Sequence, residues 1–351
     1  MGNTLQPDRD RLSNLPDDIL LHILRSLNDT KSAVRTSVLS TRWRHLWTYL
    51  QDLNFDINSF PPGGDRSSSF NFVRALLGRQ RRGNCDISRI GAFTRDIPSF
   101  LNFMRAVLAH QRPGNCRVDR LRFSADVSIG DMPIFTELIN YGLSHGVRDL
   151  VIVPASPHTG PPSWLLPDLS LASPTLETLN LRKFIIRPSS FGHPMLALTS
   201  LNLQNVAYDG GGCFDICNMI PNLTNLCLVQ IWAMNKILKI TGHKLVRLRL
   251  VDVTISGALE ISLPNLEVLE YGCYRVNDFS VINLPSLRHA ELEVGNAEYY
   301  RQRLLKLLNG ISNVESLVLN SLLLQALNDS GLLENLASPF PNLKSLKFHS
   351  P

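Results

Sequence analysis

Apolar residues recur along most of the chain in the order apolar-x-x-apolar-x-apolar, with polar residues between them. Successive copies begin 21 to 37 residues apart, a period typical of solenoid proteins. Because alternate residues of a strand face the same side, each copy predicts a short β-strand with one buried face. The clear copies begin at Leu176, Leu198, Leu223, Leu245, Leu266, Leu287, Val314 and Leu343, and weaker ones begin at Leu50, Ile87, Val118 and Val147.

Segments with a helical period lie between the more widely spaced copies, as in Phe100–Leu108 and Ile134–Ile139. Each unit is therefore predicted to be a strand, a turn and a return path that is helical when the spacing is long. Residues 70–90 are closely similar to residues 101–121, since Phe72-Val73-Arg74-Ala75-Leu76-Leu77 returns as Phe103-Met104-Arg105-Ala106-Val107-Leu108. This similarity indicates a tandem duplication of one helix–strand unit.

Residues 10–50 follow the helical period instead. Pro16 is suited to the first turn of a helix, and the acids that follow it favour the positive helix end. Asp29 or Thr30 is placed to cap a second short helix, and the apolar spacing continues into a third. A module of about 40 residues buries little on its own, so we expect it to lean on a partner. Its apolar positions include Ile19, Leu20, Ile23, Leu24, Leu27, Trp43, Leu46, Trp47 and Leu50.

Composition supports a packed globular protein, with 44% hydrophobic and 19% charged residues. No apolar run approaches the roughly 20 residues that span a bilayer, and the N-terminus lacks the features of a secretory signal. The six cysteines are too sparse for a disulfide scaffold and lack paired CxxC spacing for zinc. We therefore expect reduced thiols, no membrane partner, and a location in the nucleus, the cytoplasm or both.

Charge and motifs narrow the function further. Residues 1–120 hold 18 Lys and Arg against 11 Asp and Glu, a net charge of +7. The whole chain carries +5, so residues 121–351 carry −2. A basic segment suits binding to nucleic acid or to an acidic protein. The duplicated unit accounts for much of the arginine, however, so the basic charge is weaker evidence for nucleic-acid binding. No GxSxG, HExxH or phosphate-binding Gly-Lys-Ser/Thr motif is present. The sequence thus predicts no enzyme activity and no cofactor or metal.

Two stretches of the helical segment carry a resemblance to a known family. Leu15-Pro16-Asp17-Asp18-Ile19-Leu20-Leu21-His22-Ile23-Leu24, followed by Ser40-Thr41-Arg42-Trp43-Arg44-His45-Leu46-Trp47, resembles the F-box in the form common in plants. In that family the module binds a Skp-type adaptor, which links it to a cullin, while catalysis belongs to other subunits. The resemblance implies that the adaptor-facing residues are Leu15, Pro16, Ile19, Leu20, Ile23, Val38, Trp43, Leu46 and Trp47; the alternative is that some of them, the tryptophans above all, fill the module's own core.

The segment after the helices resembles the leucine-rich repeats that follow plant F-boxes. The predicted organisation is a flexible N-terminus (1–9), a three-helix F-box (10–50) and an α/β solenoid of right-handed β-α leucine-rich repeats (51–351) with about eleven to twelve degenerate repeats. Since the array stops just past a strand, we expect a shortened form of the family or a covered end. The residues between the apolar positions should line the concave face, where we predict a target-binding surface at Arg247, Arg249, Glu270, His289, Glu291 and Glu293.

Three functions are compatible with these features. The favoured one is the substrate-recognition subunit of a Skp–cullin–F-box ubiquitin ligase, whose repeats hold an unknown protein substrate. The first alternative is a repeat scaffold that binds proteins without ubiquitination. The second is a nucleic-acid-binding module built on Arg35, Arg42, Arg44 and the region from Arg74 to Arg120, which is weakened because large apolar residues occupy the face that would read bases.

Overall fold

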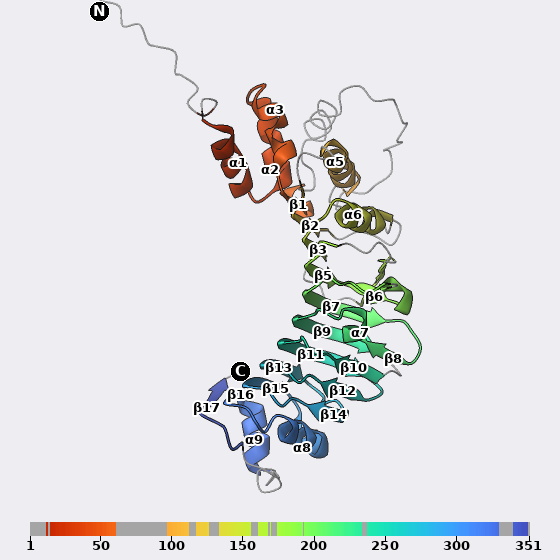
Figure 1. Cartoon of the computed structure of the whole chain (residues 1–351), viewed down its shortest axis with the longest axis vertical. Helices are drawn as coiled ribbons and strands as arrows, with labels where there is room; N and C mark the ends of the chain where they lie inside the picture. The colour runs from red at the N-terminus through yellow and green to blue at the C-terminus, as the bar shows by residue number, and fades with distance from the viewer. Residues whose placement is uncertain are drawn as a thin grey trace, which may run out of the picture. The chain divides into compact units, whose positions relative to one another are not determined.

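The structure is a computed structural model that describes residues 12, 15–60, 97–111, 117–125, 133–155, 161–167, 169, 174–191, 193–233, 237–329 and 340–349. The chain forms two compact units, residues 1–157 and 158–351. Each unit is described by itself below (Figure 1).

The first unit begins with three short helices. Helix α1 starts directly after Pro16, as predicted, and Asp18 joins Asp17 in its first turn. Asp29 caps the second helix, because its Oδ2 accepts a hydrogen bond from the Ser32 amide at 2.9 Å. The helical elements are α1 (Asp17–Ser26), α2 (Thr30–Arg35), α3 (Trp43–Leu46) and the 3₁₀ turns Thr36–Val38 and Trp47–Tyr49.

Three parallel strands and two helices complete the first unit. The strands are β1 (Asp52–Asp56), β2 (Arg120–Ser124) and β3 (Asp149–Val153), and they pair in that order with Leu53, Leu121 and Leu150 in register. Helices α5 (Ile97–His110) and α6 (Pro133–Ser144) form the return paths of the long repeats, which confirms the predicted helical segments. A run of edge-to-face and tilted aromatic contacts fills the core between sheet and helices, through Phe55, Phe60, Phe100, Phe103, Phe123 and Phe135.

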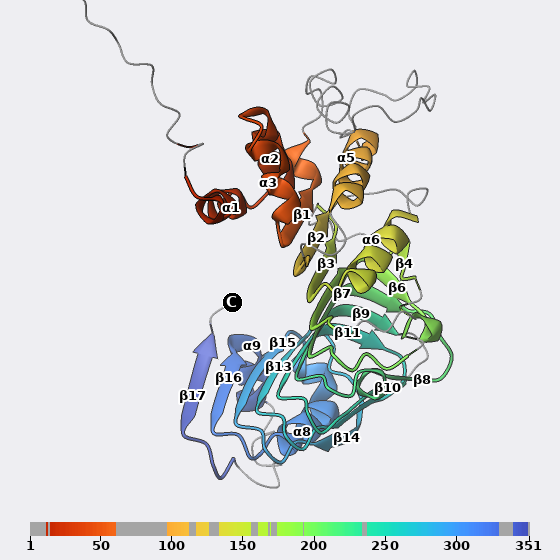
Figure 2. The ribbon, with the colours of Figure 1, turned by 45° about the horizontal axis from the view of Figure 1, so that its top comes forward.

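The second unit stacks strands of successive repeats into a parallel sheet (Figures 1 and 2). The central leucines predicted from the repeat pattern lie in register and are buried, as Leu226, Leu248 and Leu269 show. This confirms the phase of the pattern. In sheet order the strands are β5 (Thr178–Arg182), β7 (Ser200–Tyr208), β9 (Asn225–Ala233), β11 (Arg247–Ile255), β13 (Val268–Cys273), β15 (His289–Val294), β16 (Ser316–Asn320) and β17 (Ser345–His349).

A repeated corner turns each of four repeats toward a second layer. Lys183, Asn205, Gln230 and Asp252 occupy equivalent positions and all have a positive φ, between 50° and 68°. The left-handed backbone bends the chain there, and the next residue is buried in every case, from Phe184 to Val253.

The shorter repeats return through strands rather than helices. These strands form a parallel sheet of their own, β8 (Cys213–Asp215), β10 (Ile237–Thr241), β12 (Leu259–Ser262) and β14 (Phe279–Asn283). Longer repeats in this unit carry helices, so return-path structure follows repeat length as predicted. The remaining elements are β4 (Trp164–Leu165), β6 (Phe184–Ile186), α7 (Ile216–Met219), α8 (Arg301–Gly310), α9 (Ser321–Asp329) and the 3₁₀ turns Ile57–Ser59, Pro188–Phe191 and Ala297–Tyr300.

Eleven of the twelve predicted strands are therefore confirmed. The twelfth, beginning at Ile87, lies outside the described residues, as does the first copy of the predicted duplication. In the part of the chain that the structure describes, no helix combines the length and apolar character needed to cross a membrane.

Candidate docking surfaces

Helix α1 carries apolar side chains on two sides. Leu20 and Leu24 are buried within the first unit, whereas Ile19 keeps 44% of its surface exposed. The described residues leave this outer side uncovered, so it is a surface with which a partner can bury apolar area. Its other members are Leu15 and Ile23, which are half-buried, and Pro16, which is exposed.

A second exposed apolar site lies in the turn between α2 and α3. Val38 is 75% exposed, and its neighbour Leu39 is 59% exposed. Two adjacent large aliphatic side chains in water are unfavourable, which favours a protein partner at this turn. Val38 was predicted to face the adaptor, whereas Leu39 was not among the predicted residues. The signal that could have identified Leu39 is an apolar pair inside a short polar connection.

An ion pair joins the segment after this turn to the start of α1. Arg42 Nε donates a hydrogen bond to Asp17 Oδ1 at 2.8 Å, and both side chains remain partly exposed. The outer side of α1 and the Val38–Leu39 turn therefore belong to one module and are presented together. We call the set Leu15, Pro16, Ile19, Ile23, Val38 and Leu39 the outer apolar surface.

Four residues predicted to face the adaptor lie elsewhere. Trp43 and Trp47 are each 2% exposed, and the indole Nε1 of Trp47 donates to the Arg44 carbonyl at 3.0 Å. Leu20 and Leu46 are buried with them. A module of three short helices needs its largest apolar side chains for its own core. In this conformation the four side chains fill the module's own core, and their adaptor-facing role stays a prediction.

The module is fixed to the first strand and the residues after it by half-buried and exposed polar contacts. The Asn54 amide donates to Thr30 Oγ1 at 2.7 Å, and Asn54 Nδ2 donates to the Asn28 carbonyl at 2.6 Å. Lys31 Nζ donates to the Ser59 carbonyl at 2.6 Å. These bonds tie the turn between α1 and α2 to β1 and to the residues after it.

Lys31 is held in an unusual environment for a lysine. Its ammonium lies 3.7 Å from the centroid of the Phe60 ring, a cation–π geometry. Burial lowers the pKa of Lys31, and the nearby Arg35 lowers it further, while Asp29 opposes the change. The side chain is thus a structural link between the helical module and the first repeat.

The predicted target-binding residues lie on three neighbouring strands of the second unit. Arg249, Glu270 and Glu291 share one row in register, and Arg249 Nη1 lies 3.1 Å from Glu270 Oε2 in an ion pair. Glu291 Oε1 also lies 3.9 Å from His349 Nε2 of β17, a neighbour that the repeat pattern did not bring to it. Glu293 is exposed opposite Gly272, and Arg247 and His289 share another row. A target-binding role for the six residues stays a prediction.

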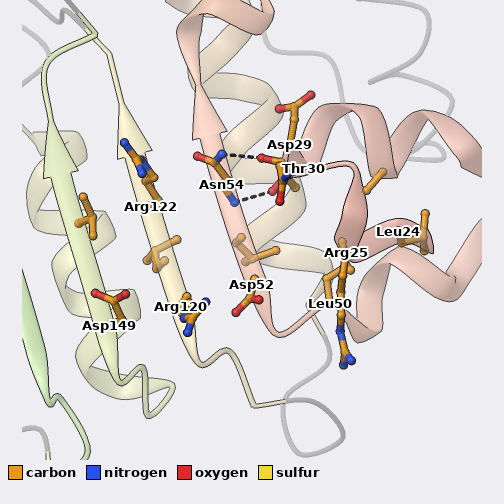
Figure 3. A pocket seen from close by; sticks show the side chains of 15 residues that line it. Leu24, Arg25, Asp29, Thr30, Leu50, Asp52, Asn54, Arg120, Arg122 and Asp149 are labelled. Carbon is orange, nitrogen blue, oxygen red and sulfur yellow. Dashed lines mark hydrogen bonds between the residues drawn. The ribbon is translucent and has the colours of Figure 1, made fainter. Parts of the chain in front are cut away.

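The first unit also contains a polar pocket that was not predicted, lined by residues of the α1–α2 corner and of strands β1, β2 and β3 (Figure 3). Asp52, Asn54 and Asp149 come together there with Arg120 and Arg122. No sequence signal joins these residues, because they are brought together by strand pairing between distant segments.

The cysteines and acidic residues show no reactive arrangement among the described residues. Burial raises the pKa of Cys217 to about 12 and that of Cys273 to about 11, so both thiols stay protonated at neutral pH. No group of three or more His, Cys, Asp or Glu within the described ranges is placed to hold a metal ion.

Comparison with known proteins finds one family and many relatives. The model of the F-box domain matches residues 12–54. F-box/LRR-repeat protein At5g38396 of Arabidopsis thaliana is 28% identical over 97% of this chain and 72% of its own length, and F-box/LRR-repeat protein At3g59210 of the same plant is 27% identical over 91% of this chain and 64% of its length. F-box/FBD/LRR-repeat protein At2g04230 is 57% identical over 54 residues, which make up 15% of this chain and 12% of that protein. No solved structure matches the chain.

Proposed function

We propose that this chain, an F-box protein with leucine-rich repeats of the plant F-box/LRR-repeat kind, is the substrate-recognition subunit of a Skp–cullin–F-box ubiquitin ligase. In this role the F-box binds a Skp-type adaptor, the adaptor links it to a cullin, and the repeats hold a protein target. The chain itself acts by binding, as F-box/LRR proteins typically do, and ubiquitin transfer belongs to other subunits.

The outer apolar surface is the observation that carries this proposal. Ile19, Val38 and Leu39 expose large aliphatic side chains within the segment that matches the F-box model. Burying apolar area against a partner is the main favourable term in such an interface. Meanwhile Asn54 and Lys31 hold the module to the first repeat, so a partner bound there is connected firmly to the start of the array.

Val38→Glu tests the adaptor contact. Truncating or charging a central apolar anchor costs about 2 kcal/mol or more, which corresponds to roughly a 30-fold loss of affinity for a purified Skp-type adaptor. Val281→Glu is the matched control, because Val281 is also an exposed valine but lies on β14 of the second unit. Calorimetric titration should show the loss for Val38→Glu alone.

Equal adaptor affinity for the parent, Val38→Glu and Val281→Glu would remove the outer apolar surface as the docking site. Co-purification from plant cells then separates the ligase from the scaffold. Adaptor and cullin recovered with the chain support the ligase subunit, whereas neither recovered leaves the repeat scaffold as the better explanation.

We further propose that the strands β11 to β15 contribute to target binding through the row of Arg249, Glu270 and Glu291. Arg249 neutralises Glu270, which leaves Glu291 and Glu293 for a basic or amide-rich segment of the target. The combined change Glu270→Gln, Glu291→Gln and Glu293→Gln should lose a set of captured proteins while adaptor binding is retained. An identical set would exclude this surface.

A further inference from the structure

The polar pocket of the first unit is a hollow of about 390 Å³. Its wall combines buried leucines, among them Leu24 and Leu50, with charged side chains from all three strands (Figure 3). The volume falls at the lower end of the range of about 300–1,000 Å³ that ligand pockets occupy. The pocket is therefore too small for a folded domain and suited to a few residues of extended chain.

Strand register sorts the polar residues of the pocket into two rows. Asp52, Arg120 and Asp149 pair across β1, β2 and β3, so one row reads acid, base, acid. The next row, two residues further along each strand, reads Asn54, Arg122 and Val151. Arg122 thus has no carboxylate in its own row. The two rows present opposite charges about 6.6 Å apart along the strand direction.

Four charged groups on the strands that line the hollow are not paired with one another. Among the described residues, no ion pair within 4.0 Å joins Asp52, Asp149, Arg120 and Arg122, although all four line the pocket. Both arginines and Asp52 are exposed, and Asp149 is half-buried. Opposite charges that face one hollow without touching are available to a ligand that brings its own charges.

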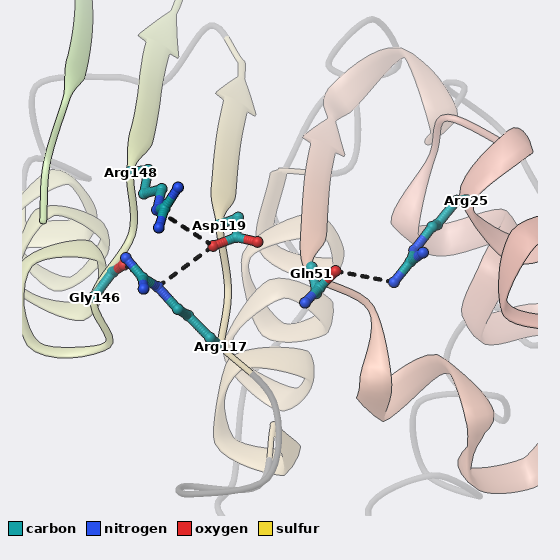
Figure 4. Close-up of polar contacts among 6 residues, drawn as sticks. All are labelled: Arg25, Gln51, Arg117, Asp119, Gly146 and Arg148. Atoms are coloured by element: carbon teal, nitrogen blue, oxygen red, sulfur yellow. Dashed lines mark hydrogen bonds and ion pairs between the residues drawn. The ribbon is translucent and has the colours of Figure 1, made fainter. Parts of the chain in front are cut away.

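Three neighbouring arginines, unlike Arg120 and Arg122, have polar partners within the chain (Figure 4). Arg25 Nη2 donates to Gln51 Oε1 at 3.0 Å. Asp119 Oδ1 lies 3.4 Å from Arg117 Nε and 4.0 Å from Arg148 Nε. Arg117 and Arg148 are engaged at the start of the strands, outside the rows that face the hollow, whereas Arg25 lines the hollow but has Gln51 as its partner.

Two acceptors in the pocket wall also lack donors. Asn54 Oδ1 and Asp149 Oδ1 are enclosed and accept no hydrogen bond. The backbone N–H and Nδ2 of Asn54 donate hydrogen bonds to the helical module instead. Burial raises the pKa of Asp149, the charge of Asp52 raises it further, and Arg120 and Arg122 oppose the shift. Enclosed acceptors without donors are rare in folded proteins and call for a partner group.

We propose that this pocket binds an extended segment of the target protein in which an acidic and a basic residue are separated by one residue. Side chains i and i+2 of an extended chain lie on the same side about 6.6 Å apart, which matches the separation of the two rows. The acidic side chain lies against Arg122, and the basic side chain lies against Asp149 and Asp52. The inference rests on the proposed function for the idea that the occupant is a target, and it adds what the target's segment must contain.

The test uses the purified full-length chain and a displayed library of random seven-residue peptides. Peptides with an acid and a base at i and i+2 should be enriched at least about 10-fold over peptides with the same two residues adjacent, because adjacent side chains of an extended chain face opposite sides. Arg122→Glu should abolish that enrichment and favour two basic residues at i and i+2. Arg301→Glu, at an exposed arginine that begins α8, is the matched control and should leave the enrichment unchanged.

Two results would overturn the proposal. One is equal recovery of spaced and adjacent pairs on the parent chain, and the other is unchanged selection by Arg122→Glu. Arg122→Gln provides a second variant that adds no charge and should lose only the preference for acid. Adaptor binding is measured on the same preparations, so that a failed library selection with retained adaptor binding counts against the pocket alone, whereas lost adaptor binding by the parent counts against the proposed function.

Discussion

Leu248 offers a direct measure of how the repeat core stabilises the second unit. Its side chain is 1% exposed and lies in register between Leu226 and Leu269, which are equally buried. Leu248→Ala removes buried methyl groups and leaves a cavity between two neighbouring repeats, so we expect a loss of about 2–5 kcal/mol in the free energy of unfolding.

The corresponding change in melting temperature follows from the size of the unit. Residues 158–351 form one compact unit, and for domains of about 150–250 residues each kcal/mol shifts Tm by roughly 2–4 °C. Leu248→Ala should therefore lower Tm by on the order of 10 °C in a calorimetric melt of the full chain. Leu196→Ala is the control, because Leu196 is a leucine of the same unit that is 64% exposed, and its change should stay within about 0.5 kcal/mol.

Hydrogen exchange adds the spatial pattern. Because each repeat is stabilised by its neighbours, the loss of protection in Leu248→Ala should spread over β9, β11 and β13 together. Equal melting temperatures for Leu248→Ala and Leu196→Ala would show that the assigned phase of buried and exposed positions is wrong. Loss of protection confined to β11 would refute the sharing of stability between repeats.

Three further outcomes follow from the first unit. Leu15→Ala combined with Pro16→Ala should weaken adaptor binding in a calorimetric titration while the melting curve stays that of the parent, because both residues lie at the start of an uncovered helix side. Trp47→Ala should instead unfold the helical module, at a cost of about 3–5 kcal/mol, and limited proteolysis should cut residues 15–50 sooner than in the parent. Asp149→Asn should raise stability at pH 7 in urea unfolding and change little near pH 3. Burial raises the folded-state pKa of Asp149 above its unfolded value, so the ionised carboxyl destabilises the fold at pH values above the folded pKa, and that penalty disappears as the pH falls below the unfolded pKa. A uniform effect of Asp149→Asn at both pH values would contradict this assignment.

The strands of the fold could be predicted because burial imposes a period on the sequence. Leu179, Leu201 and Leu226 repeat the same position, and the structure places them in register in one core. Repeat length likewise predicted where helices return, as at α5 and α6. The strand positions and the helical return paths both depend on the order and spacing of apolar residues within one repeat.

The corners of the second unit could not be predicted in this way. A residue with left-handed backbone is usually glycine, which makes such positions recognisable in a sequence. These corners instead have Lys183, Asn205, Gln230 and Asp252. Only Asn and Asp favour that conformation moderately, so no common residue type marks the position. The tertiary stack of corners over one another holds the conformation, and that information is not local.

The tryptophans show the same limit for the docking surface. A helical pattern identifies apolar positions, but it does not say whether the chain or a partner covers them. Ile19 and Leu20 are adjacent apolar residues of one helix, and the structure exposes the first while it buries the second. Which apolar residues remain exposed for a partner depends on how the three helices pack together, and the helical pattern does not specify that packing.

Asn54 connects the two proposals physically. Its backbone N–H and Nδ2 hold the turn between α1 and α2, while its enclosed Oδ1, in the pocket wall, accepts no hydrogen bond. A substitution of Asn54 would therefore loosen the helical module and alter the pocket at once, and its effect on adaptor or target binding could not be assigned to either. Arg122 lies in the same row but makes no contact with the helical module among the described hydrogen bonds and ion pairs, so changes at Arg122 act on the pocket alone. This separation makes the outer apolar surface and the pocket independently testable even though one strand, β1, supports both.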